Sequence, residues 1–106
     1  SSGRKKPEPI PNSEFEMKAD MVIKALGFDP EDLPKLFNSS DLSISTLGTI
    51  KINLKTMETN LPGVFAAGDI VRGASLVVWA IRDGRDATIQ IKKYLEHKQR
   101  KDVEAA

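Results

Sequence analysis

The residues best suited to chemistry lie where a short apolar run ends in a glycine and an aspartate. Residues 64–67 are apolar, and Gly68 and Asp69 follow them directly. Glycine lets a ligand or another backbone approach closely. A carboxylate at the carboxyl end of a buried strand lies where open α/β sheets place their ligands. Asp69 is therefore a candidate for binding ligand hydroxyl groups; the alternative is that it only caps a strand–turn–helix connection.

A second candidate site is the start of the long helix predicted for residues 75–99. This stretch contains no proline and follows Gly73 and Ala74, and Ser75 is the expected N-cap. The first amide N–H groups of a helix have no partner within the helix. They attract electron-rich ligand atoms. Asp69 and this helix start together form a site suited to hydroxyl and carbonyl oxygens.

Composition excludes several other classes of site. The chain has no cysteine, so it cannot hold a disulfide, an iron–sulfur cluster or a cysteine nucleophile. Its single histidine, His97, is expected to be solvated, and we expect neither a catalytic residue nor a metal site. The net charge of +1 gives no reason to expect nucleic acid or an anionic membrane as a partner. No apolar run approaches the ~20 residues that span a bilayer, so a cytoplasmic location is the default.

The spacing of apolar residues predicts the strands and helices that position these candidate residues. A tail, either disordered or a cloning remnant, is expected over residues 1–12. Residues 13–18 alternate as in a half-exposed strand, and residues 21–23 fit a short buried strand. A short helix is expected next, with Asp29 as N-cap and Pro30 at its first position.

The second half of the chain predicts a hairpin, a further strand and the long helix. Residues 42–44 and 49–54 bracket Gly48, and alternation over residues 50–55 favours a β-hairpin. Residues 64–67 are the fourth strand. The long helix has apolar or small residues at three- and four-residue spacing, which predicts the face that packs on the strands. That face comprises Val77, Ala80, Ile81, Gly84, Ala87, Ile91 and Leu95.

The segment TNLPGVFAAGD at residues 59–69 resembles the second FAD-contacting motif of flavoproteins with two dinucleotide-binding domains. The continuation IVRGASLVVWAIRDGRDA at residues 70–87 resembles the C-terminal end of chains in the glutamate synthase small-chain family. Residues 19–28 (ADMVIKALGF) resemble the strand of that family that re-enters the FAD domain. The resemblance implies an α/β fold: a partial Rossmann-like domain with short strands packed on one long C-terminal helix. Residues 13–99 would be the C-terminal part of the FAD-binding domain and residues 100–106 a tail.

The resemblance also implies roles for individual residues. Asp69 would bond the ribityl hydroxyls of FAD, and Gly68 would allow that approach. The backbone amides of Leu76 and Val77, next to Ser75, would face the flavin ring. Gly27 and Ala67 would line the crevice. Three other expectations come from the residues themselves: Trp79 lies in the core or an interface, the arginines at 72, 82 and 85 form salt bridges, and Gly84 packs closely on the sheet.

The implied activity is electron transfer from NADPH through FAD to iron–sulfur centres, in a parent protein that partners the glutamate synthase large chain. Neither a Gly-x-Gly-x-x-Gly motif nor a cysteine is present, so NADPH and the iron–sulfur clusters would bind outside this chain. We therefore expect a fragment that is inactive alone, binds FAD weakly or not at all, and can self-associate through apolar faces that normally meet the remainder of the flavoprotein. Two alternatives stay open: a non-enzymatic α+β association module, and the same electron-input module in a dihydropyrimidine-dehydrogenase-like or ferredoxin–NADP-type oxidoreductase.

Overall fold

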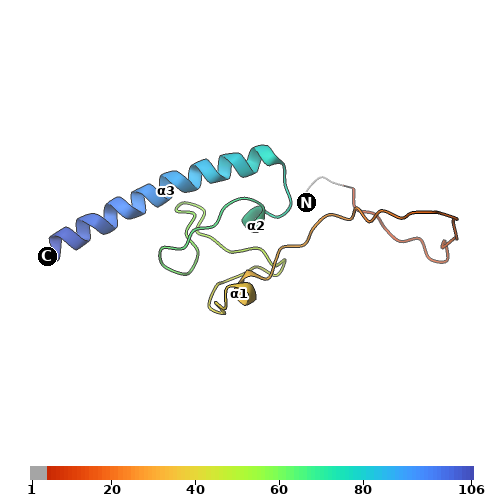
Figure 1. The fold of residues 1–106 in the computed structure, drawn as a ribbon, viewed down its shortest axis with the longest axis horizontal. Coiled ribbons are helices and arrows are strands. Elements are labelled where there is room, and N and C mark those ends of the chain that lie inside the picture. Colours follow the sequence, from red (N-terminus) through yellow and green to blue (C-terminus); the bar gives the residue numbers. More distant parts are fainter. Residues whose placement is uncertain (1–4) are drawn as a thin grey trace.

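The computed structural model describes residues 5–106, which form an extended arm, a small body and one long helix (Figure 1). The expectation that Ser1–Gly3 is a cloning remnant lies outside the described residues. The arm comprises residues 5–32 and the body residues 33–73. Three helices follow in order: α1 (Leu33–Leu36), α2 (Asp69–Arg72) and α3 (Val77–Glu104).

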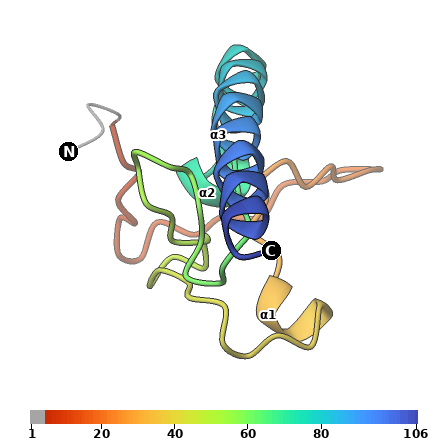
Figure 2. The same cartoon turned by 90° about the vertical axis from the view of Figure 1, so that its left-hand side faces the viewer.

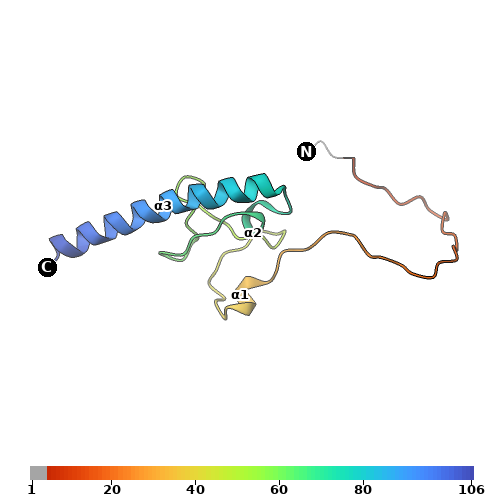
Figure 3. The ribbon, with the colours of Figure 1, turned by 45° about the horizontal axis from the view of Figure 1, so that its top comes forward.

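The arm contains neither helix nor strand, and it sweeps out from the body and back again (Figure 3). The strands predicted at residues 13–18 and 21–23 are therefore not formed. Val22 is 85% exposed and Phe28 is 97% exposed. The apolar residues have the composition of a strand, but no neighbouring strand in the described chain supplies the backbone partners that a sheet requires.

The short helix α1 confirms the predicted helical stretch but not its cap. Asp32 is the N-cap, and its carboxylate accepts a hydrogen bond from the Lys35 amide at 3.4 Å. Pro34 lies in the first turn, where its missing N–H removes no helical hydrogen bond. The prediction of Asp29 as N-cap was wrong by three residues, because the chain turns into the helix only after Asp32.

Strand-type pairing in the body is limited to two isolated antiparallel β-bridges within residues 5–106. Ile44 pairs with Ile50 around the predicted turn at Gly48, and Glu58 pairs with Phe65. The predicted hairpin and the predicted strand at residues 64–67 are thus reduced to single bridges. Leu42 and Ile50 are the buried apolar residues here, and the hydroxyls of Ser45 and Thr49 bond at 2.7 Å beside them.

The long helix α3 lies across one side of the body and projects beyond it (Figures 1 and 2). It begins at Val77 rather than Ser75 and continues past Gln99 to Glu104. Asp83 and Ala87 are its buried residues, and Gln90 and Tyr94 are half-buried. The face towards the body is therefore rotated by roughly a quarter of a turn from the predicted apolar face.

This rotation has a physical reason in the partners that the body offers. The ring of Tyr94 meets Phe65 edge-on, with centroids 5.6 Å apart, and Asp83 meets a charged residue of α2. Much of the predicted face is left exposed, including Val77, Ile81 and Leu95. The body is too small to cover a helix of 28 residues.

The dimensions of the molecule reflect this open arrangement. The radius of gyration is 20.2 Å, whereas a compact domain of about 100 residues has a value near 13 Å. No helix within residues 5–106 combines the length and the apolar character that crossing a bilayer requires.

Candidate functional site

Asp69 begins α2 and follows a glycine in an unusual backbone conformation. Gly68 is the N-cap residue, with φ 81° and ψ −152°, a region that is essentially restricted to glycine. No side chain of the N-cap residue bonds the helix start in this described segment, and Asp69 is exposed in the first turn. Asp69 is thus not the residue that caps the connection, and its carboxylate is accessible to a ligand.

A hollow of about 170 Å³ brings Asp69 next to the end of the arm. Phe28, Asp29 and Pro30 line it on one side, and Asp69, Ile70 and Ala74 on the other. Gly27 directly precedes this lining and has φ 85°. Two of the segments that the sequence analysis singled out, 40 residues apart, therefore meet at one site.

Ala67 and Gly68 face a different hollow, of about 270 Å³. Its apolar wall is formed by Ile52, Leu54, Met57 and Val71, and its charged wall by Arg72, Asp83 and Asp86. A Cβ atom added to Gly68 would meet no atom within 4 Å in the described structure, so the space beside this backbone is open.

The start of α3 differs from the prediction in one respect. The N-cap is Leu76, with extended dihedral angles, and not Ser75. Ser75 lies one residue too early for its hydroxyl to bond the first helical amides, and among the described residues no side chain of the N-cap takes that place. Leu76 and Val77 are both exposed. The first amides of α3 therefore have no capping side chain, and the binding role expected for Ser75, Leu76 and Val77 stays a prediction.

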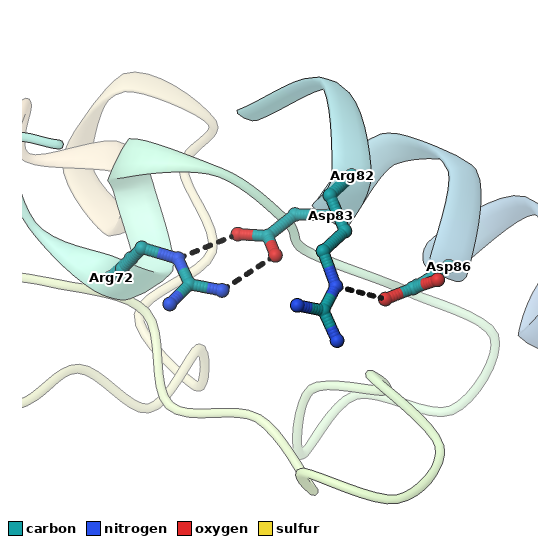
Figure 4. A network of polar contacts seen from close by, with 4 residues as sticks. All are labelled: Arg72, Arg82, Asp83 and Asp86. Atoms are coloured by element: carbon teal, nitrogen blue, oxygen red, sulfur yellow. Dashed lines mark hydrogen bonds and ion pairs between the residues drawn. The ribbon is translucent and has the colours of Figure 1, made fainter. Parts of the chain in front are cut away.

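An ion pair joins the last residue of α2 to the second turn of α3 (Figure 4). The Arg72 guanidinium donates to both carboxylate oxygens of Asp83, from Nε at 2.9 Å and from Nη2 at 2.6 Å. Asp83 is only 7% exposed. The Arg72 hydrogen bonds hold the pKa of the Asp83 carboxyl below its ordinary value, against the opposing effect of burial, and the Gly68 backbone amide acts in the same direction.

Trp79 lies between two of the arginines. The guanidinium carbons of Arg72 and Arg82 are 5.1 Å and 5.4 Å from the ring centroid. Arg82 also pairs with Asp86 at 3.7 Å, one turn along α3. The predicted salt bridges of Arg72 and Arg82 are confirmed, whereas Arg85 forms none within residues 5–106. Trp79, 38% exposed, stacks with cations rather than lying in a core.

The expectation for Gly84 was wrong in this structure. A Cβ atom placed on Gly84 would meet nothing within 4 Å among the described residues, so the glycine is not required by close packing. The sheet on which it was expected to pack is not formed. The neighbouring residue Asp83 is buried and bonded to Arg72, but the sequence analysis did not identify it as a site residue.

No group of histidine, aspartate and glutamate side chains in residues 5–106 could hold a metal ion. His97 is exposed on α3. The candidate site offers hydrogen-bonding groups: the Asp69 carboxylate, the backbone around Gly68 and the uncapped amides of α3.

The sequence of this chain matches one protein family and several known oxidoreductases. Residues 2–84 match the model of the family described as pyridine nucleotide-disulphide oxidoreductase. The chain is 55% identical over its full 106 residues to the glutamate synthase [NADPH] small chain of Azospirillum brasilense, of which it covers 22%. It is 57% identical over 95 residues, 90% of its length, to the putative small chain of Cereibacter sphaeroides, of which it covers 23%.

The similarity extends to other oxidoreductases. The beta subunit of the NADP(+)-dependent formate dehydrogenase of Moorella thermoacetica is 42% identical over 94 residues, which are 89% of this chain and 13% of that protein. This chain thus spans less than a quarter of the length of each of these three relatives.

Proposed function

Because this chain belongs to the pyridine nucleotide-disulphide oxidoreductase family, we propose that it forms part of the FAD site of a glutamate synthase small-chain-type oxidoreductase. The observation that carries the proposal is the accessible carboxylate of Asp69, which follows a glycine-only backbone conformation at Gly68. The match of this chain to the small chain of Azospirillum brasilense extends over all 106 residues, Asp69 included.

The residues at this site fit the chemical groups of FAD. The ribityl chain of FAD carries hydroxyl groups, and an exposed carboxylate accepts hydrogen bonds from them. The open space beside Gly68 lets a ligand approach the backbone. Ala67 and Gly27 would line the cofactor crevice through their backbones, and residues 13–99 would be the FAD-domain part of the chain.

The start of α3 would contact the flavin ring of FAD, whereas Asp69 would contact the ribityl chain. Amides of Leu76 and Val77, following Ser75, would donate to the polar edge of the flavin ring, where the helix dipole favours negative charge. FAD, when bound, supplies the redox chemistry of the parent protein. The role of this chain is to bind and orient that cofactor; none of its residues need exchange a proton with a substrate.

The names of the relatives support a proposed electron donor and a proposed partner. Both small chains are described as NADPH glutamate synthases, so NADPH is the proposed donor and the large chain the proposed partner. NADPH and the iron–sulfur clusters would bind to other parts of the parent protein. The family match favours this reading over a non-enzymatic association module.

The test uses the full-length parent protein and its FAD affinity. Asp69→Ala removes a charged hydrogen-bond acceptor, so FAD should bind on the order of 10- to 100-fold more weakly. Asp41→Ala removes an exposed carboxylate outside the hollow and should leave the affinity unchanged. The measurement is a titration of apoprotein with FAD, followed by flavin fluorescence.

Two further outcomes decide the matter. A parent protein that purifies colourless and remains so with added FAD would contradict the proposal. The 106-residue chain, titrated in parallel, should show weak FAD binding or none, because it lacks a Gly-x-Gly-x-x-Gly motif to cradle the pyrophosphate.

A further inference from the structure

The buried carboxylate of Asp83 belongs to α3, but its strongest contacts lie on α2. Both oxygens of the carboxylate accept hydrogen bonds from the Arg72 guanidinium, and only 10% of the Asp83 side chain is exposed (Figure 4). A two-point contact between a planar guanidinium and a carboxylate fixes orientation as well as distance. The pair therefore determines how α2 lies against α3.

The single turn of α2 carries that constraint from Arg72 back to Asp69. The Arg72 amide donates to the Gly68 carbonyl at 2.9 Å, and the Gly73 amide donates to the Asp69 carbonyl at 2.8 Å. The Ile50 amide holds the Ile70 carbonyl at 2.7 Å from the side of the body. Because the carbonyls of residues 68–70 are all bonded, two of them to the amides of Arg72 and Gly73, a displacement of Arg72 displaces Asp69 with it.

The covalent connection between α2 and α3 supplies little stiffness of its own. It runs through residues 73–76, beginning at a glycine with φ 84°. Neither helix start is bonded by the side chain of its N-cap residue in this part of the structure. Contacts across the junction include the Arg72–Asp83 pair, the Gly68 backbone amide at the Asp83 carboxylate and the stacking of Arg72 on Trp79.

We propose that Asp83 is a positioning residue for the FAD site: it anchors Arg72 and thereby sets the placement of Asp69 relative to the open amides of α3. The inference rests on the function proposed above. It assigns the role to a side chain that does not line the Asp69 hollow.

The test is a double-mutant cycle in the full-length parent protein, with FAD as the probe. Asp83→Asn retains the size of the side chain and removes the charge, and it should weaken FAD binding on the order of tenfold through misplacement of Asp69. In the Asp69→Ala background the same change should alter the affinity less than about twofold, because the group that it positions is gone. Apoprotein titration gives the four dissociation constants.

The matched control is Glu96→Gln. It removes a carboxylate further along α3, whose partner Lys92 lies on the same helix, and should leave FAD affinity unchanged because Glu96 lines neither hollow of the site. Arg72→Lys keeps the charge but loses the planar fork. It should weaken FAD binding as Asp83→Asn does, and it replaces that variant in the cycle if Asp83→Asn does not fold.

The results separate this proposal from the proposed function. If Asp69→Ala weakens FAD binding and neither Asp83→Asn nor Arg72→Lys does, the positioning role is wrong and the proposed function stands. Equal losses in the wild-type and Asp69→Ala backgrounds would also overturn it, since they would indicate general destabilisation. If Asp69→Ala itself has no effect, both proposals fall.

Discussion

At the scale of single residues, the ionised state of Asp83 couples the folded structure to pH. Burial alone would favour the neutral acid. The hydrogen bonds from Arg72 outweigh that effect, so the pKa of Asp83 lies below its ordinary value of 3.8. The reciprocal contact raises the pKa of Arg72, which keeps the guanidinium charged throughout the accessible range.

We predict that part of the stability of this chain is lost in acid through Asp83. A carboxyl group whose pKa is lowered by folding contributes stability above its unfolded pKa, and this contribution disappears as pH falls through the folded pKa. The loss should therefore begin near pH 4 and grow below it. Urea unfolding at neutral pH and at about pH 3 measures it. Asp83→Asn should show a smaller difference between the two conditions; an equal difference would contradict the prediction.

Asp69 could be proposed from the sequence as a candidate site residue because its signal is local: an apolar run, a glycine and a carboxylate in succession. Asp83 could not, because its partner lies on a helix that the sequence analysis did not predict. One signal was available. At position 83 the aspartate falls four residues before Ala87, and a carboxylate on the buried side of a helix requires a partner.

At the scale of elements, the long helix was predictable and its limits were not. A proline-free stretch with apolar residues at helical spacing indicates a helix regardless of its surroundings. Its first residue depends on the dihedral angles of Leu76, and its buried face depends on where Phe65 and Arg72 lie. These features depend on tertiary contacts, which the sequence of the helix alone does not reveal. The predicted strands failed for a related reason, because a strand is stable only beside another.

Two glycines in helical contexts should respond in opposite ways to substitution by alanine. Gly68→Ala forces a side chain into a glycine-only conformation, which should cost about 1–3 kcal/mol of unfolding free energy. Gly84→Ala lies in the interior of α3 with open space around it. It should raise the unfolding free energy by up to about 1 kcal/mol.

Thermal or urea unfolding of the 106-residue chain compares the two variants directly. Repeating the Gly84→Ala measurement in the full-length parent protein tests the original expectation for this residue. A stabilised chain together with a destabilised parent would indicate that Gly84 packs against a part of the parent that this chain does not contain.

At the scale of the whole molecule, apolar side chains along the arm and α3 remain in contact with solvent. Seven of those on the arm are at least 77% exposed: Phe15, Met17, Met21, Val22, Ile23, Leu26 and Phe28. Monomeric proteins rarely leave so much apolar surface uncovered. An extended apolar segment also offers free backbone groups to any available strand.

We predict that the isolated chain self-associates through the arm. Sedimentation velocity should give a mass above that of the 11.7 kDa monomer, increasing with concentration. Val22→Lys places a charge within the apolar run and should shift the distribution towards monomer. Glu16→Lys, which changes charge at a polar position of the same arm, is the control and should not. A monomeric wild-type chain at all concentrations would refute this prediction.

The great length of α3 has a practical consequence for labelling. At about 1.5 Å per residue its 28 residues extend about 42 Å, so the C-terminus ends well away from Asp69 (Figure 1). A fluorescent protein or affinity tag fused there would be carried at the end of a long helix, away from the proposed FAD site. The same fusion at the junction of α2 and α3 would separate Asp69 from the α3 amides with which it is proposed to act.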